Sequence, residues 1–68
     1  MGTMSEQMAW NIGNDMAKEL GAKLPFPPLY QFHLALETAV PNYTKLGPEY
    51  QADLIAEAAT GWKDGLDD

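Results

Sequence analysis

The stretch that decides the fold reads LPFPPLYQFHLAL, residues 24–36. It begins as a connector, because each proline fixes its own φ and pushes the preceding residue out of the helical region. We therefore expect residues 24–27 to be extended and Pro28 to occupy the first helical position, where no N–H donor is needed. A helix should follow over residues 28–40, because Pro41 ends it.

The helix predicted at 28–40 is apolar on two sides. At 3.6 residues per turn, one broad face carries Leu29, Phe32, Ala35, Leu36, Ala39 and Val40. Tyr30 and Leu34 fall on nearly the opposite side. A surface helix needs a single apolar stripe, so this helix needs cover on both sides. We expect the preceding and following helices, or a second copy of the chain, to provide that cover.

The preceding helix is predicted at residues 4–20. Apolar residues recur in it at four-residue spacing, and they are Met4, Met8, Ile12, Met16 and Leu20. This stripe predicts the core face of the helix, and the alternative is an adaptable Met-rich binding surface. Trp10 lies off this stripe, either at the edge of the core or as an exposed anchor for a partner. Gly13 and Ala17 form a pair of small residues that can admit a close neighbour.

The third helix is predicted at residues 48–62 and begins at Pro48. Between the second and third helices, residues 41–47 should form a connector with at most one helical turn, from which Tyr43 and Leu46 fold back onto the core. Residues 64–68 are expected to be a frayed acidic tail. The sequence thus predicts an all-α, three-helix bundle in a single small domain, residues 1–68, with a helical homodimer as its main variation.

The charge is strongly negative and unevenly spread. Ten acidic residues face four lysines and no arginine, which gives a net charge of −6. Six of the acids and one lysine lie in residues 49–68, where Glu49, Asp53 and Glu57 recur at four-residue spacing. This balance disfavours nucleic acid and anionic membranes, and it favours a basic protein partner. The alternative is a solvated face that keeps a small domain soluble.

Residue types needed for several kinds of chemistry are missing. The chain has no cysteine and one histidine, so it lacks the pairings for nucleophilic catalysis and for a structural zinc site. His33 with Glu37 is expected to be a packing or surface pair. We therefore expect no enzymatic activity, no cofactor and no metal. No basic region precedes an apolar run at the N-terminus, and we expect a cytoplasmic protein.

The function that these features favour is a small acidic interaction module that binds and modulates another protein. Such a module would be an inhibitor, an antitoxin-like regulator, an adaptor or a phage-type regulator. The residues expected to contact the partner are Trp10, Tyr30, Leu34, Glu49, Asp53, Glu57 and Trp62. The alternatives are a structural module that associates with itself and, less favoured by charge, a helix-turn-helix DNA binder with its turn at residues 41–47.

Overall fold

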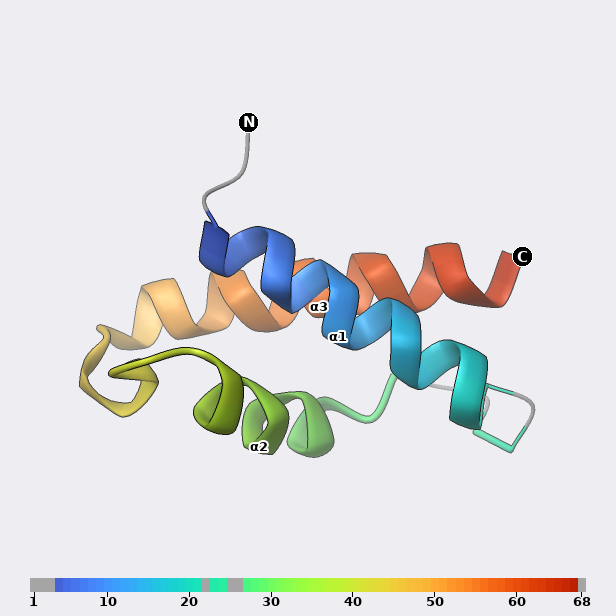
Figure 1. Cartoon of the computed structure of the whole chain (residues 1–68), viewed down its shortest axis with the longest axis horizontal. Helices are drawn as coiled ribbons and strands as arrows, with labels where there is room; N and C mark the ends of the chain where they lie inside the picture. The colour runs from blue at the N-terminus through green and yellow to red at the C-terminus, as the bar shows by residue number, and fades with distance from the viewer. Residues whose placement is uncertain (1–3, 22, 25–26, 68) are drawn as a thin grey trace.

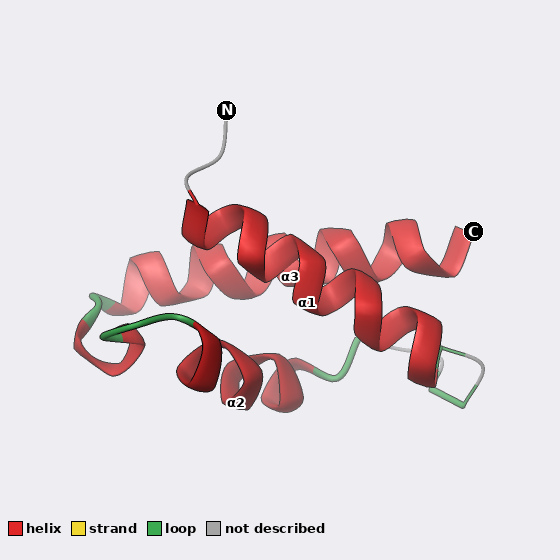
Figure 2. Cartoon of the chain, in the orientation of Figure 1, coloured by secondary structure: helices red, strands yellow, loops and turns green. Residues whose placement is uncertain are grey.

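The computed structural model describes residues 4–21, 23–24 and 27–67, and over these residues the chain is helical with irregular connectors (Figure 2). The elements in order are α1 (Met4–Leu20), α2 (Leu29–Ala39), the 3₁₀ turn η1 (Tyr43–Lys45) and α3 (Pro48–Asp67). The predicted all-α, three-helix bundle is therefore confirmed.

Helices α1 and α3 lie side by side and run in the same direction, while α2 runs back in the opposite direction (Figure 1). Their alignment follows from close approaches in which the residue numbers rise together. Gly13 lies against Ala58, and further along Gly65 lies against Ala17. The contact between α1 and α3 is the main one in the bundle, and α2 contacts both helices.

The residues of α1 that face the core are small, unlike those of the predicted stripe. The buried positions are Ala9, Gly13, Asn14 and Ala17. The larger stripe residues, Ile12, Met16 and Leu20, are partly buried at the edge of the core, and Met4 is 82% exposed. The prediction was wrong for Met4. The physical reason is that α3 comes too close to α1 for large side chains between them, so these border the contact instead.

Prolines flank α2, but the helix is one residue shorter at each end than the predicted 28–40. Pro28 does not occupy the first helical position, because its ψ of 79° is not helical. Pro28 precedes the helix and is its N-cap, and the backbone N–H of Phe32 donates to the carbonyl of Pro28 at 3.0 Å. At the other end, Pro41 holds Val40 in an extended conformation, with φ −99° and ψ 115°. Pro25 and Phe26, part of the run predicted to be extended, lie outside the described residues.

The connector between α2 and α3 contains one helical turn, η1, in agreement with the prediction of at most one turn at residues 41–47. Asn42 takes a left-handed conformation with φ 64°, which reverses the chain before η1. Tyr43 is then buried and Leu46 packs against the core, which confirms that both fold back. The side chain of Gln51 fixes this turn to α3, because its Nε2 donates to the carbonyls of Tyr43 and Leu46 at 2.8 and 3.0 Å.

Helix α3 continues past its predicted end near residue 62, to Asp67. Residues 64–67, predicted to belong to a frayed tail, are helical, and Asp68 lies outside the described residues. The reason is Gly65, which is buried against α1. Its contact with Ala17 gives the last turn of α3 a packing partner that the sequence pattern does not reveal.

The core lies where α2 meets the other two helices. Its largest fully buried side chains are Trp62, Tyr43, Phe32, Leu36 and Leu54. Phe32 and Trp62 meet edge-on, with ring centroids 6.1 Å apart. On the other side of α2, Tyr30 and Leu34 remain 73 and 45% exposed. The prediction was wrong for Leu29 and Ala39 of the broad face, which are also exposed, because they lie at the two ends of the helix. One side of α2 is therefore covered by this chain, and the second cover expected from its apolar residues is not supplied by the described residues.

Candidate functional site

Close packing of α1 on α3 brings Trp10 to a groove between the two helices. The carbonyl of Trp10 lies directly against Gly61, where a Cβ would overlap it. Asn14, one turn further along, is buried, and its Nδ2 donates to the carbonyl of Gly61 at 3.2 Å. The backbone of α1 at Trp10 is thus packed directly on α3.

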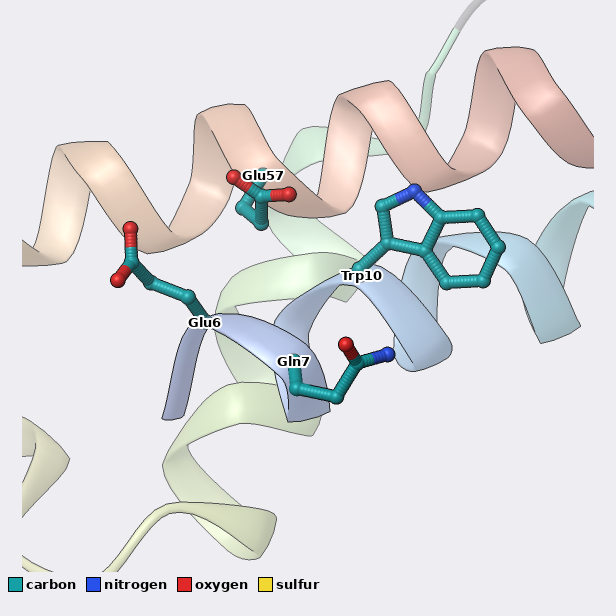
Figure 3. A pocket seen from close by; sticks show the side chains of 4 residues that line it. All are labelled: Glu6, Gln7, Trp10 and Glu57. Carbon is teal, nitrogen blue, oxygen red and sulfur yellow. The ribbon is translucent and has the colours of Figure 1, made fainter. Parts of the chain in front are cut away.

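Trp10 is half-buried and forms one wall of a cavity of about 320 Å³. The other lining residues are Glu6 and Gln7 from α1 and Glu57 from α3 (Figure 3). The indole Nε1–H donates to Oδ2 of Asp64, on α3, at 3.3 Å. The cavity is therefore lined by acidic residues from two different helices and by an aromatic residue whose ring is hydrogen-bonded to α3.

Acidic side chains continue from this cavity along α3. Glu49 and Asp53 are exposed, and Glu57 is half-buried. Each is separated from the next by about one turn, so all three lie along the same flank of the helix. Among the described residues, no lysine lies within 4.0 Å of these three carboxylates. Their negative charge is thus not compensated locally, which suits attraction of a positively charged group.

A second candidate surface lies on α2 and is apolar. Tyr30 and Leu34 are exposed on the side of α2 that has no second cover, and Leu29, at the first turn of the helix, is exposed as well. A shallow cavity of about 440 Å³ adjoins them, lined by Pro27, Pro28, Leu29, Tyr30 and Gln31. No charged residue occurs in residues 24–36, so this surface differs in character from the acidic flank of α3.

Trp62, which was expected to contact a partner, is a core residue. Its side chain is 1% exposed, and it packs on Phe32 of α2. The reason is its position on the flank of α3 that faces α2, opposite to the flank with the acids. Its Nε1 is buried and has no hydrogen-bond acceptor among the described residues, which marks a cost of burial rather than a recognition group. We therefore exclude Trp62 from the candidate surface.

His33 forms a contact that the sequence did not predict. Its Nδ1 lies 3.1 Å from the hydroxyl of Tyr43, and the two rings meet edge-on with centroids 5.3 Å apart. The expected neighbour Glu37 is also close, with Oε2 3.8 Å from Nε2. Burial raises the pKa of Tyr43 above its ordinary value, and the nearby carboxylate of Glu37 raises it further. The group joins α2 to the connector and lines neither of the two cavities.

Sequence reasoning missed three residues of the groove: Glu6, Gln7 and Asp64. They belong to it because α1 and α3 are parallel and in contact. The signal that could have located them is the spacing of small residues. Gly13 and Ala17 lie four residues apart on α1, as Gly61 and Gly65 do on α3, and all four lie in the contact between these helices.

Comparisons with known proteins give no further guide to the site. No protein-family model, no curated protein and no solved structure matches this chain. Within the described part of the chain, no group of three or more acidic or histidine residues is placed to hold a metal ion. Over the same residues, no helix has the length and apolar character needed to cross a membrane.

Proposed function

We propose that this protein is a small acidic interaction module that binds a basic surface of another protein and thereby modulates it. The observation that carries the proposal is the groove between α1 and α3, which is lined by Trp10 and Gln7 together with the acidic residues Glu6 and Glu57. Aromatic residues dominate the binding energy of protein interfaces, and uncompensated charge steers an oppositely charged partner toward them.

The arrangement combines the two kinds of contact that such an interface needs. The indole supplies an apolar surface, and its hydrogen bond to Asp64 ties it to α3. The acids of α3 supply charge along its edge, at Glu49 and Asp53. A partner would therefore need lysine or arginine residues, spaced to follow about two turns of helix, around a group that reaches the groove.

The test is to purify the tagged protein with its bound proteins at low and at high salt. A variant with Glu49→Gln, Asp53→Asn and Glu57→Gln removes three charges from the acidic flank. A matched control has Asp15→Asn and Glu19→Gln, which remove charges from exposed positions of α1 outside the groove. We expect a partner that the wild type and the control retain at low salt, and that high salt or the α3 variant releases.

A partner that the α3 variant retains in full would contradict the proposal, as would the recovery of no partner under any condition. Circular dichroism of each variant verifies that the helices are intact. Because the substituted side chains are polar and not buried, their loss should leave the fold in place.

A second candidate function, self-association, is favoured by the exposed apolar surface of α2. Leu29, Tyr30 and Leu34 are exposed on this helix. A chain of 68 residues buries only a small core, so burying these side chains between two copies would add stability. Light scattering at micromolar concentration tests it. A mass near twice 7.5 kDa supports a homodimer, and a mass of one chain at all concentrations contradicts it.

A further inference from the structure

Helix α2 is attached to the bundle less extensively than α1 and α3 are attached to each other (Figure 1). It buries Phe32 and Leu36, and the ring of Phe32 lies edge-on against Trp62 of α3. A hydrogen bond between His33 and the hydroxyl of Tyr43 adds a polar contact to this packing. The attachment of α2 thus depends on contacts between side chains, in contrast to the backbone contacts that join α1 to α3.

The ends of α2 add little to its stability. Its N-cap residue, Pro28, makes no side-chain hydrogen bond, and the helix has no acidic residue in its first turn and no basic residue in its last turn. A helix of 11 residues is also too short to be stable in water on its own. A separated α2 would therefore melt, which would expose its backbone amides to water.

The other elements are held together without α2. In the close contact between α1 and α3, the carbonyl of Gly61 accepts a hydrogen bond from Asn14. The turn η1 stays with α3, because the side chain of Gln51 donates to two carbonyls of the connector. Residues 40–42, between α2 and η1, are not helical, so α2 can separate there without breaking another helix.

The core against α2 contains a group that gains from such a separation. Nε1 of Trp62 is buried and has no hydrogen-bond acceptor among the described residues. A buried donor without a partner costs free energy, and water would satisfy it once α2 moves away. This cost offsets part of what the apolar contacts of α2 contribute to stability.

We infer that α2 is a lid, which separates from the other two helices and melts as one unit while α1 and α3 stay paired. Its opening exposes the ring of Trp62, which the closed chain buries completely. Such partial openings require less free energy than unfolding of the whole chain. The lid does not depend on the proposed function, because the residues that line the acidic groove lie on α1 and α3 and keep their places in the open state.

Hydrogen exchange of the ¹⁵N-labelled protein, followed by NMR, measures the opening. The amides to compare are those of residues 32–40 in α2 with those of residues 13–17 in α1 and 58–62 in α3. If α2 opens alone, its amides should be protected at least about tenfold less than the amides of α1 and α3. The indole N–H of Trp62 should exchange together with the α2 amides, because Phe32 covers this ring.

The matched variants are Ala35→Gly in α2 and Ala56→Gly in α3. Each places a glycine inside a helix, which changes an opening equilibrium about fivefold. Ala35→Gly weakens the closed state relative to both the open and the unfolded states, so all these amides should exchange faster. Ala56 is exposed and lies on a helix that stays intact in the open state, so Ala56→Gly should accelerate the amides of α1 and α3 only. The α2 amides should then stay within about a factor of two of the wild type.

Thr60→Ala gives the reverse test with a variant that strengthens α3 and carries no risk to folding. It should slow the amides of α1 and α3 about twofold and leave those of α2 unchanged. Equal protection of the two groups in the wild type would overturn the inference, as would equal effects of Ala56→Gly or Thr60→Ala on both groups, because α2 would then open only when the whole chain unfolds. A Trp62 indole that follows the α3 amides in these variants would show that α2 is not the cover of this ring.

Discussion

Helices α1 and α2 both pack against α3, but they do so in different ways. The contact of α1 with α3 is made by small residues, so close that backbone atoms meet at Gly13, Gly61 and Gly65. The contact of α2 with α3 is made by large side chains, chiefly Phe32 against Trp62. The first contact fixes a groove with polar walls, and the second leaves one apolar side of α2 open.

This difference explains where the two candidate surfaces arise. Backbone contact holds α1 and α3 in one register, which brings Glu6 and Glu57 to the same cavity. Side-chain contact allows α2 to bury Phe32 and Leu36 on one side only, and Tyr30 and Leu34 on its other side remain exposed. The close contact of α1 with α3 thus forms a defined cavity, and the one-sided packing of α2 leaves an exposed apolar surface.

The largest effect is expected from breaking the close contact at its centre. In Gly13→Val, the new Cβ would overlap the carbonyl of Ala58, which is backbone and cannot move without separating the helices. We expect the free energy of unfolding to fall by at least about 3 kcal/mol. This is close to the whole stability of a chain of this size, so most of the variant should be unfolded. Circular dichroism with urea denaturation measures the loss.

The matched control for Gly13→Val is Gly47→Ala. Gly47 lies in the connector with no atom within 4 Å of an added Cβ, and its φ is not positive. This variant should stay within about 1 kcal/mol of the wild type, because alanine restricts the unfolded chain but is a poorer N-cap for α3 than glycine. A folded Gly13→Val protein with unchanged stability would show that α1 and α3 are not in this close contact.

A smaller effect is expected from the buried hydrogen bond of the same contact. In Asn14→Asp, the new carboxylate cannot donate to the carbonyl of Gly61, and the two oxygens would face each other in a buried place. We expect a loss of about 2 kcal/mol at pH 7. Burial and the facing carbonyl raise the pKa of the new carboxyl group in the folded state, so its protonated form is favoured there.

The pH dependence of Asn14→Asp follows from that direction. The folded state binds the proton more tightly than the unfolded state, so the deficit relative to the wild type is full above the folded pKa and disappears as the pH falls below about 4. Urea denaturation of both proteins at pH 7 and at pH 3.5 measures it. A deficit that is the same at both pH values would argue against the hydrogen bond of Asn14.

The sequence predicts those features of the fold that depend on residues close together in the chain, and it misses those that depend on residues far apart in it. Prolines and periodic apolar residues are local, and they place all three helices and the turn at Tyr43. The pairing of α1 with α3 is not local, and it depends on glycines that carry no hydrophobic signal. Tyr30 and Leu34 were correctly singled out as a separate side of α2, but their exposure could not be inferred without knowing which side its neighbours occupy.

The same limit explains the different outcomes for the two tryptophans. Trp10 and Trp62 both lie on helices that carry polar and apolar residues, and the sequence alone does not tell which of the two side chains is buried. What separates them is the neighbour: Gly61 faces α1 and the next residue, Trp62, faces α2. Glu49, Asp53 and Glu57 were easier to place on a surface, because ionised carboxylates are rarely buried without partners. Whether they bind a partner stays a prediction.

On the α2 side, a moderate effect is expected from Tyr43→Phe. The hydroxyl of Tyr43 is lost, and with it the hydrogen bond to His33, so we expect about 1 kcal/mol less stability at neutral pH. The pKa of Tyr43 is raised in the folded state, so the folded state retains the proton and wild-type stability falls as the pH rises above about 10.

Tyr43→Phe removes this ionisation, so the variant should lose less stability than the wild type between neutral pH and pH 11. Urea denaturation at pH 7.5 and at pH 11 gives the comparison, and Tyr30→Phe, which alters an exposed tyrosine, is the control. Parallel losses in the wild type and Tyr43→Phe would mean that another group causes the alkaline effect.

The smallest effect on stability is expected on the open side of α2. Tyr30→Gln with Leu34→Gln replaces two exposed apolar residues by polar ones, so the free energy of unfolding should stay within about 0.5 kcal/mol of the wild type. The measurement is urea denaturation at a concentration where light scattering gives the mass of one chain. Thr38→Gln, at an exposed polar position of the same helix, is the control. A loss of 2 kcal/mol or more in the double variant would show that this side is covered in the single chain. α2 would then be packed on both sides, and the contrast with α1 would rest on the glycines alone.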